Sequence, residues 1–237
     1  MLVLGIDSST PVASAAIVSA EGLIGEITLN IGLTHSEQLL PMIDELFRQT
    51  RTTLGEMGGI AVAGGPGSFT GLRIGMATAK GLAQGGKIPL VSVPGLQALA
   101  WRHAGLNGLI SPVLNARRQE VYAALFRSSQ GDLEQLAEDC AVSPRDWAQI
   151  LNKYAGPVLF CGDGAQAFRQ EWSALLGERA VFLPPALTLN NAVTVAHLGR
   201  EKLAAGQADD LYTLKPSYIR MSEAQVRLCR QQAEPGR

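Results

Sequence analysis

The sequence of 237 residues has little of what disulfide-bonded, zinc-binding or membrane-spanning proteins need. Its three cysteines, Cys140, Cys161 and Cys229, are odd in number and widely spaced, which excludes a disulfide framework and a zinc knuckle and fits a reducing cytosol. The apolar regions are all well short of the roughly 18 residues of a membrane span. The apolar stretch at the beginning of the sequence is interrupted by Asp7. We therefore expect a cytoplasmic protein without a leader peptide, a membrane segment or a bound metal.

The chain also lacks an excess of charge, because its net charge at pH 7 is only −1. A protein that binds nucleic acid alone needs a concentrated basic face, since phosphate contacts dominate that affinity. The candidate arginines are too few to make one, and we expect them to be solvated: Arg117, Arg118, Arg220, Arg227 and Arg230. Any contact with nucleic acid is therefore expected only within a larger assembly.

Several site motifs are absent as well. The histidines His35, His103 and His197 are isolated, and no His-x-x-x-His pair exists to hold a metal. Neither Gly-x-x-x-x-Gly-Lys-Ser/Thr nor Gly-x-Gly-x-x-Gly occurs, and Lys80 lies too far into its helix to act as a phosphate lysine. We expect no metal and no cofactor, and we interpret His35 as a capping or packing residue at a helix start.

What the chain does have is a glycine-rich stretch at residues 64–82. An apolar strand at 60–63 leads into a turn of glycine and proline, and a helix at 70–84 follows directly. Small residues recur on one face of this helix, at Gly71, Gly75, Ala79 and Ala83. The pattern is compatible with a phosphate cradle at a helix N-terminus or with a close helix–helix contact, and the missing nucleotide motifs favour the contact.

A second polar turn lies near the N-terminus. An apolar strand at 2–6 is followed by Asp7, Ser8, Ser9 and Thr10, and a second strand begins at 12. A carboxylate and three hydroxyls between two strands are typical of the first phosphate loop of the actin, Hsp70 and sugar-kinase superfamily. An ordinary hairpin turn has the same residue types, so the turn alone leaves both interpretations open.

Hydrophobic periodicity predicts the same order of elements in each half of an α/β chain. The expected strands are 2–6, 12–18, 23–29, 60–63, 89–93, 109–114, 120–127, 133–137 and 157–161. The expected helices are 36–49 behind a Thr34–Glu37 capping box, 70–84, 144–152, one from 165, and 190–205. We predict a first lobe at 1–100 joined by the returning helix 190–206, a smaller second lobe at 101–189, and a tail at 207–237.

Six segments, taken together and in this order, resemble the TsaB (YeaZ) family of bacterial tRNA-modification proteins, and the resemblance covers most of the chain. They are residues 5–9, 35–43, 65–75, 116–122, 162–164 and 218–220. Residues 65–75, Gly-Pro-Gly-Ser-Phe-Thr-Gly-Leu-Arg-Ile-Gly, match the family's hallmark.

The resemblance implies an actin-like (ASKHA, ribonuclease H-like) two-lobed α/β fold with a shortened second lobe. It further implies a non-catalytic scaffold that works with TsaD and the ATPase TsaE. That assembly transfers threonylcarbamoyl from threonylcarbamoyl-AMP to N6 of the adenosine next to the anticodon, in tRNAs reading codons that begin with adenine.

Departures from the family and superfamily patterns favour a loss of catalysis. Asn115 stands where family members usually have Asp, and the metal-binding His pair of TsaD is missing. Asp7 is the one carboxylate in a candidate active position, and a lone carboxylate cannot divide acid, base and metal roles. We therefore expect no catalytic residue, a remnant phosphate loop at residues 7–10, and a plain strand-to-helix turn at 162–164.

The alternative, from another class, is a free-standing kinase or ATP hydrolase that uses Asp7 and the glycine turn. A third interpretation, the old family label of endopeptidase, fails because the metal-binding pair is absent.

The resemblance also predicts a partner. We expect the chain to pair with TsaD in the cell and with a second copy of itself when alone, through the helices at 36–49 and 70–84. The predicted contact residues are Leu39, Leu40, Ile43, Phe47, Gly71, Leu72, Gly75, Met76, Ala79 and Ala83.

Overall fold

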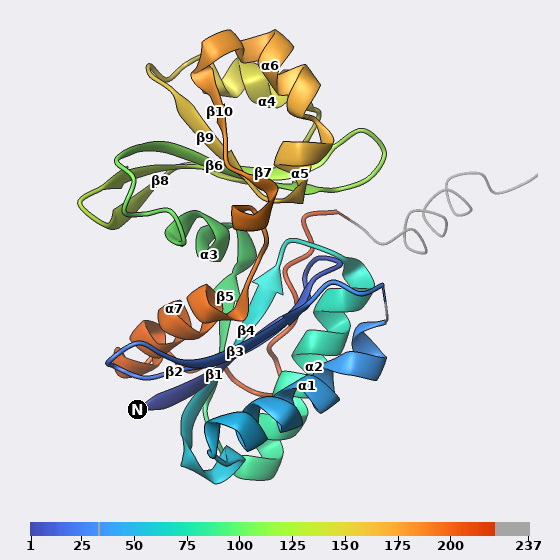
Figure 1. Ribbon diagram of the computed structural model, residues 1–237, viewed down its shortest axis with the longest axis vertical. Coiled ribbons are helices and arrows are strands. Elements are labelled where there is room, and N and C mark those ends of the chain that lie inside the picture. Colours follow the sequence, from blue (N-terminus) through green and yellow to red (C-terminus); the bar gives the residue numbers. More distant parts are fainter. Residues whose placement is uncertain (33, 221–237) are drawn as a thin grey trace, which may run out of the picture.

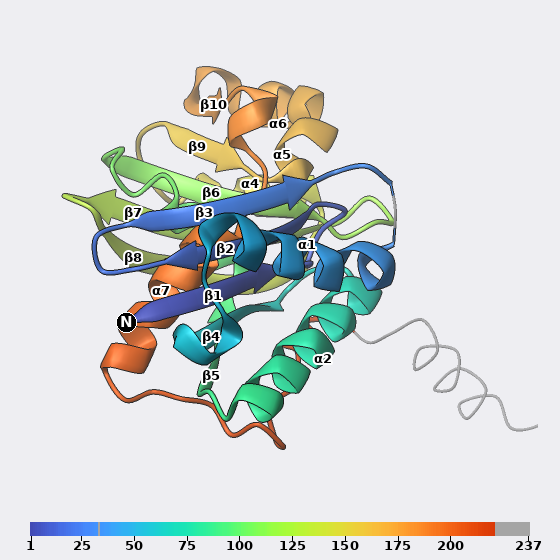
Figure 2. The ribbon, with the colours of Figure 1, turned by 60° about the horizontal axis from the view of Figure 1, so that its bottom comes forward.

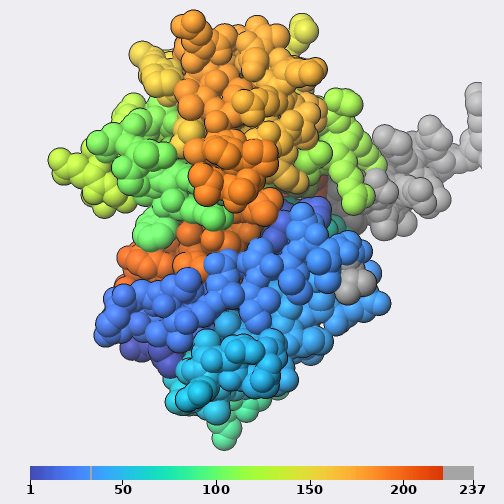
Figure 3. All heavy atoms as spheres, in the orientation of Figure 1, coloured from blue at the N-terminus to red at the C-terminus, as the bar shows by residue number. Residues whose placement is uncertain are grey.

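The computed structural model describes residues 1–32 and 34–220, and within them the chain forms two lobes that each contain a five-stranded sheet. Cys229, Arg227 and Arg230 lie outside the described residues. The first hundred residues occupy one end of the molecule and residues 108–182 the other (Figures 1 and 3).

The sheet of the first lobe has the strand order β3-β2-β1-β4-β5. The first three strands form an antiparallel meander, and β4 and β5 continue the sheet in parallel. The bounds are β1 (Leu2–Asp7), β2 (Ala13–Val18), β3 (Leu23–Leu29), β4 (Met57–Gly65) and β5 (Leu90–Pro94).

Both faces of this sheet are covered by helices (Figures 1 and 2). Helices α1 (His35–Thr50) and α2 (Phe69–Gly86) pack on one face, and α7 (Ala192–Ala204) packs on the other. Because successive strand residues point to opposite faces, Leu4 and Ile6 join the apolar core under α1 and α2, whereas Val3 joins the core under α7. The alternating side chains of β1 therefore contribute to both apolar cores.

The second sheet repeats the first, with the order β10-β9-β6-β7-β8. Its strands are β6 (Gly108–Asn115), β7 (Val121–Ser129), β8 (Asp132–Val142), β9 (Val158–Cys161) and β10 (Ala180–Phe182). Helices α4 (Pro144–Leu151) and α6 (Arg169–Leu176) cover one face, where Trp147 and Trp172 are fully buried. The short helices α3 (Gly95–Trp101) and α5 (Asp163–Ala167) also pack on β6.

The expected strands and helices are present, and the largest differences at their ends are in β4 and β8, which extend beyond the predicted ranges 60–63 and 133–137. The structure adds α3, β10 and three short 3-10 turns at Leu54–Glu56, Gly177–Arg179 and Pro185–Leu187. It also divides the helix predicted from 165 into α5 and α6. The Thr34–Glu37 capping box is confirmed. In the described part of the chain, no helix is both long and apolar enough to cross a bilayer.

Candidate functional site

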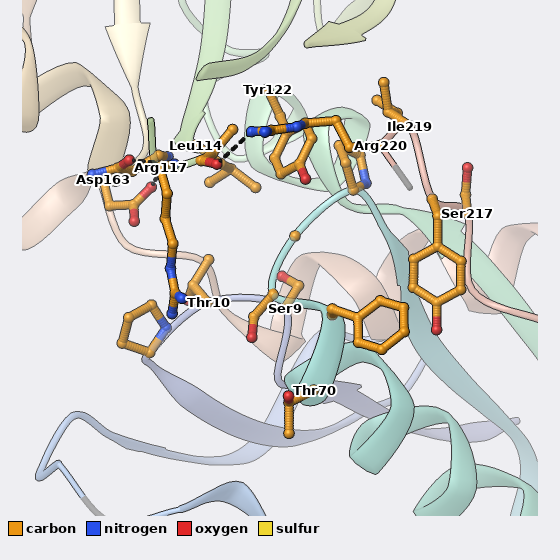
Figure 4. Close-up of a pocket in the computed structure, with 18 of the residues that line it drawn as sticks. Ser9, Thr10, Thr70, Leu114, Arg117, Tyr122, Asp163, Ser217, Ile219 and Arg220 are labelled. Atoms are coloured by element: carbon orange, nitrogen blue, oxygen red, sulfur yellow. Dashed lines mark hydrogen bonds between the residues drawn. The ribbon is translucent and has the colours of Figure 1, made fainter. Parts of the chain in front are cut away.

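A cavity of about 700 Å³ lies between the two lobes. It is where the β1–β2 turn and the start of α2 face the β6–β7 loop and the start of α5 (Figure 4). Residues 217–220, which follow α7 in the chain, form a further wall. The lining combines hydroxyl groups, guanidinium groups and aromatic rings, among them Ser9, Thr10, Phe69, Thr70, Arg117, Tyr122, Tyr218 and Arg220.

The carboxylate of the first turn is buried beside this cavity and does not line it. Asp7 is 2% exposed, and its Oδ1 accepts hydrogen bonds from the Ser9 amide at 2.9 Å and the Ser9 hydroxyl at 2.6 Å. The Asn190 amide group donates to Oδ2 at 3.4 Å. Burial away from water raises the pKa of Asp7 above 3.8, and these hydrogen bonds oppose that rise. Asp7 therefore holds the turn and the segment before α7 together.

The glycines of α2 let this turn approach the helix closely. A Cβ atom at Gly71 would overlap the Ser8 carbonyl oxygen, and one at Gly75 would overlap the Ser8 hydroxyl. Ser8 Oγ donates to the Gly71 carbonyl at 2.8 Å, and the Ser68 amide donates to the Ser9 carbonyl at 2.7 Å. The close contact predicted from the small residues exists, but at Gly71 and Gly75 it is with the chain's own first turn.

The ten residues predicted to contact a partner are mostly inside the first lobe, which corrects that choice of residues. Leu40 is 54% exposed and Phe47 is partly buried, whereas the other eight are buried. The reason is that the apolar stripes of α1 and α2 fill the core over the sheet. Eight of the chosen residues are therefore buried within the lobe: Leu39, Ile43, Gly71, Leu72, Gly75, Met76, Ala79 and Ala83.

Facing the first turn, the β6–β7 loop has an unusual backbone. Arg117, Arg118 and Gln119 all adopt left-handed φ angles, of 61°, 54° and 62°. Such angles are uncommon outside glycine and persist where the surroundings hold them. Asn115 contributes to this, because its Oδ1 accepts from the Arg117 amide at 2.9 Å. The Arg117 side chain extends toward Thr10 of the first lobe (Figure 4).

Asp163 is the acidic residue that lines the cavity. Its Oδ1 accepts from the Asn115 amide at 2.9 Å, and burial raises its pKa above 3.8. Residues 162–164 connect β9 to α5, which confirms the predicted strand-to-helix turn. Asp163 thus fixes the end of β6 through this hydrogen bond.

Of the three histidines, His35 lines the cavity, and His103 and His197 are not among the described residues that line it. His35 begins α1, and its Nε2 lies 2.7 Å from the Thr10 carbonyl oxygen, in the packing role predicted for it. His197 stacks on Trp101 and pairs with Glu201, away from His35. Among residues 1–32 and 34–220, no group of three or more His, Cys, Asp or Glu side chains could hold a metal ion.

In the cavity wall at residues 217–220, the structure corrects the prediction for Arg220 and shows a packing role of Tyr218 that the sequence did not predict. Arg220 was expected to be solvated, but its guanidinium donates to the Ala116 carbonyl at 2.9 Å and pairs with Glu120 at 2.9 Å. Tyr218 lies against Phe69 of α2, with ring centroids 4.8 Å apart. These partners are about a hundred or more positions away in the chain, so no local pattern could predict them.

The fold defines the class. Two sheets of the same strand order, with helices on their faces and a cavity between them, form an actin-like two-lobed α/β protein. A solved activator of 2-hydroxyisocaproyl-CoA dehydratase from Clostridium difficile has this fold, with a TM-score of 0.50 at 11% identity over 87% of this chain and 97% of that one.

Sequence comparison narrows the class to a family. The family model described as "TsaD: tRNA N6-adenosine threonylcarbamoyltransferase" matches residues 25–228. The Bacillus subtilis tRNA threonylcarbamoyladenosine biosynthesis protein TsaB is 34% identical over 96% of this chain and 97% of its own length. A Pseudomonas aeruginosa structure described as similar to the peptidase YeaZ aligns with a TM-score of 0.80 at 26% identity, over 92% of this chain and 99% of that one. The chain belongs to the TsaB family.

Proposed function

We propose that this chain is a non-catalytic accessory subunit in tRNA threonylcarbamoyladenosine biosynthesis, the process for which its B. subtilis relative is named. In this proposal it pairs with a TsaD-type transferase, and the TsaE ATPase completes the assembly. The assembly transfers the threonylcarbamoyl group from threonylcarbamoyl-AMP to N6 of the adenosine next to the anticodon. The match of the chain to the transferase family model supports a shared fold for the two subunits.

The environment of Asp7 carries the non-catalytic part of the proposal. A general base or metal ligand must reach the reacting group, but Asp7 is 2% exposed and its Oδ1 is occupied by Ser9. Asp163, which lines the cavity, accepts a hydrogen bond from the Asn115 amide through its Oδ1. Both carboxylates therefore stabilise the local structure around them through hydrogen bonds.

We also propose that the partner docks on the outer face of α1 and α2, next to residues that pack inward. Leu40 on α1 and Ala77 on α2 are exposed. Gly81 and Gly85 continue the outer face of α2, and a Cβ atom at either would meet nothing within 4 Å. The small residues Ala77, Gly81 and Gly85 leave this part of the α2 surface with little side-chain bulk, so a helix of a second subunit can approach it closely. The same face would form the homodimer when the chain is alone.

Reconstitution tests the proposal. Purified TsaD and TsaE are incubated with tRNA and threonylcarbamoyl-AMP, with or without this chain, and the modified nucleoside is measured by mass spectrometry. Product should require the chain, while Asp7→Asn and Asp163→Asn should retain wild-type activity. A folded Asp7→Asn or Asp163→Asn variant that loses activity by about 100-fold or more, as removal of a general acid or base does, would contradict the non-catalytic role.

A second candidate is a kinase or ATP hydrolase, and the cavity between the lobes favours it. Its hydroxyl groups and arginines, with the start of α2 at one wall, are groups that can bind phosphate. The buried Asp7 counts against it, because that carboxylate does not line the cavity.

A further inference from the structure

The segment after α7, residues 205–220, forms hydrogen bonds along the first lobe. The Asp209 amide donates to the Leu90 carbonyl at 2.8 Å, and its carboxylate accepts from the Ser92 amide at 2.6 Å, so this residue covers the free edge of β5. Lys80 of α2 donates to the Leu214 carbonyl at 2.6 Å. The segment runs beside β5 and α2 and then turns toward the cavity (Figures 1 and 2).

At the cavity the segment becomes part of the α2 surface. The Ser217 amide donates to the Gly64 carbonyl at 2.7 Å. Tyr218 then packs on Phe69, and the Arg73 guanidinium lies 3.9 Å from the centroid of the Phe69 ring. Arg73 Nε also donates to the Tyr218 hydroxyl at 3.0 Å. Arg73 therefore joins the exposed face of α2 to the end of the segment.

Two residues later, the segment crosses to the second lobe. Arg220 donates to the Ala116 carbonyl and pairs with Glu120, and both partners belong to the β6–β7 loop with its three left-handed residues. The Arg220 and Glu120 side chains are 26% and 38% exposed. An ion pair this open to solvent contributes little to stability, whereas main-chain hydrogen bonds anchor the other end. The contacts of Arg220 with the β6–β7 loop can therefore break while the main-chain hydrogen bonds of the segment with the first lobe remain.

We propose that residues 217–220 are a latch that holds the two lobes together, supports the strained β6–β7 loop and closes one wall of the cavity. Because Arg73 contacts the latch and lies on the outer side of α2, a partner that docks there changes the equilibrium between the closed and the open latch. This coupling rests on the proposed function. The latch itself does not, because its contacts lie within one chain.

Hydrogen exchange on the full chain tests the latch. The Ala116 and Glu120 amides are hydrogen-bonded within the β6–β7 loop, so they report on its opening. Arg220→Ala and Tyr218→Ala should raise exchange at 116–120 by about fivefold or more, with no change in β4. Tyr212→Ala is the matched control, because Tyr212 is 80% exposed and belongs to the same segment. Unchanged exchange at 116–120 in Arg220→Ala, or a rise spread over the whole chain, overturns the latch.

The same measurement with purified TsaD added tests the coupling. TsaD should change exchange at 116–120 in the wild-type chain, and Tyr218→Ala should abolish that change without abolishing binding. An equal change in wild type and in Tyr218→Ala overturns the coupling, because it indicates direct contact with the loop. If TsaD does not bind the wild-type chain, the proposed function fails, and the measurements without TsaD still decide the latch.

Discussion

At the scale of single residues, small and polar groups determine how closely the first turn and α2 approach. Ser8 contacts α2 at both Gly71 and Gly75, and its hydroxyl donates to the helix backbone. Any side chain at Gly71 meets a carbonyl oxygen, which cannot move without moving β1 or the turn. Other glycines of the same helix, such as Gly81, have open space around them. Position along the helix therefore decides the effect of a substitution more than residue type does.

Gly71→Ala should lower the free energy of unfolding by about 1–3 kcal/mol, because the added methyl group overpacks the contact with Ser8. Gly81→Ala is the control, and it should raise stability by about 0.5–1 kcal/mol, because glycine disfavours a helix interior and nothing lies near the new methyl group. Urea denaturation followed by circular dichroism measures both. Equal effects of the two substitutions would contradict the close contact.

A second residue-scale prediction concerns pH. Burial lowers the pKa of His103 from 6.5 to about 4, with a smaller effect of Arg102. Between these values the unfolded chain binds more protons at this site, so His103 lowers stability as the pH falls from 6.5 toward 4. The expected loss is about 1–3 kcal/mol, and His103→Leu should not show it. Denaturation of both proteins at pH 7, 5.5 and 4.5 measures the difference, and parallel losses would show that His103 is not responsible.

At the scale of elements, α1 and α2 have one face in the core and one face outside. The sequence stripes identify the inner face well, since the helices bury Leu39, Ile43, Met76 and Ala79 as part of one core. The error was to assign the same residues to a partner. Because a helix buries one stripe at a time, the partner surface that we propose has to use the opposite positions, such as Ala77.

Ala77→Arg should weaken binding to TsaD by about tenfold or more, because it places a bulky charge in a close crossing. Its thermal stability should stay near the wild-type value, since Ala77 is exposed. Ala174→Arg is the matched control, because it changes an exposed alanine of α6 on the second lobe. Binding measured by calorimetry and melting by fluorescence separate the two effects. Normal binding by Ala77→Arg would place the partner surface elsewhere.

At the scale of the whole molecule, two similar halves lie on either side of one cavity. We propose that residues 1–100 with helix α7 act as one lobe and residues 101–189 as the other. The second sheet repeats the strand order of the first. The loop of each half that faces the cavity has its own internal bonding, through Asp7 in the first and through Asn115 and Asp163 in the second.

The chain alone should neither hydrolyse nor measurably bind ATP–Mg. The physical reason is that Asp7 is buried and accepts hydrogen bonds from Ser9, and that Oδ1 of Asp163 accepts a hydrogen bond from the Asn115 amide, so both carboxylates are engaged within the chain. Calorimetry with ATP–Mg, together with a phosphate-release assay, measures both properties. Stoichiometric binding, with turnover that is lost in Asp7→Ala, would instead establish the kinase or hydrolase alternative.

The sequence by itself determined the order of the elements, their approximate ends and the family. Alternation and helical stripes reflect which face of an element is buried, and turns such as residues 162–164 depend on local backbone chemistry. The residues that mark the family are also contiguous, so a linear reading finds them.

Tertiary structure alone decided what those elements face. The inward direction of Asp7, the contact of Gly71 with Ser8 and the crossing of Arg220 to Ala116 join positions that are distant in the chain. A small residue on a helix shows that something approaches closely, but it does not show whether the neighbour belongs to the same chain or to a partner. That choice is made by the packing of the two helices on their sheet, which local periodicity does not encode.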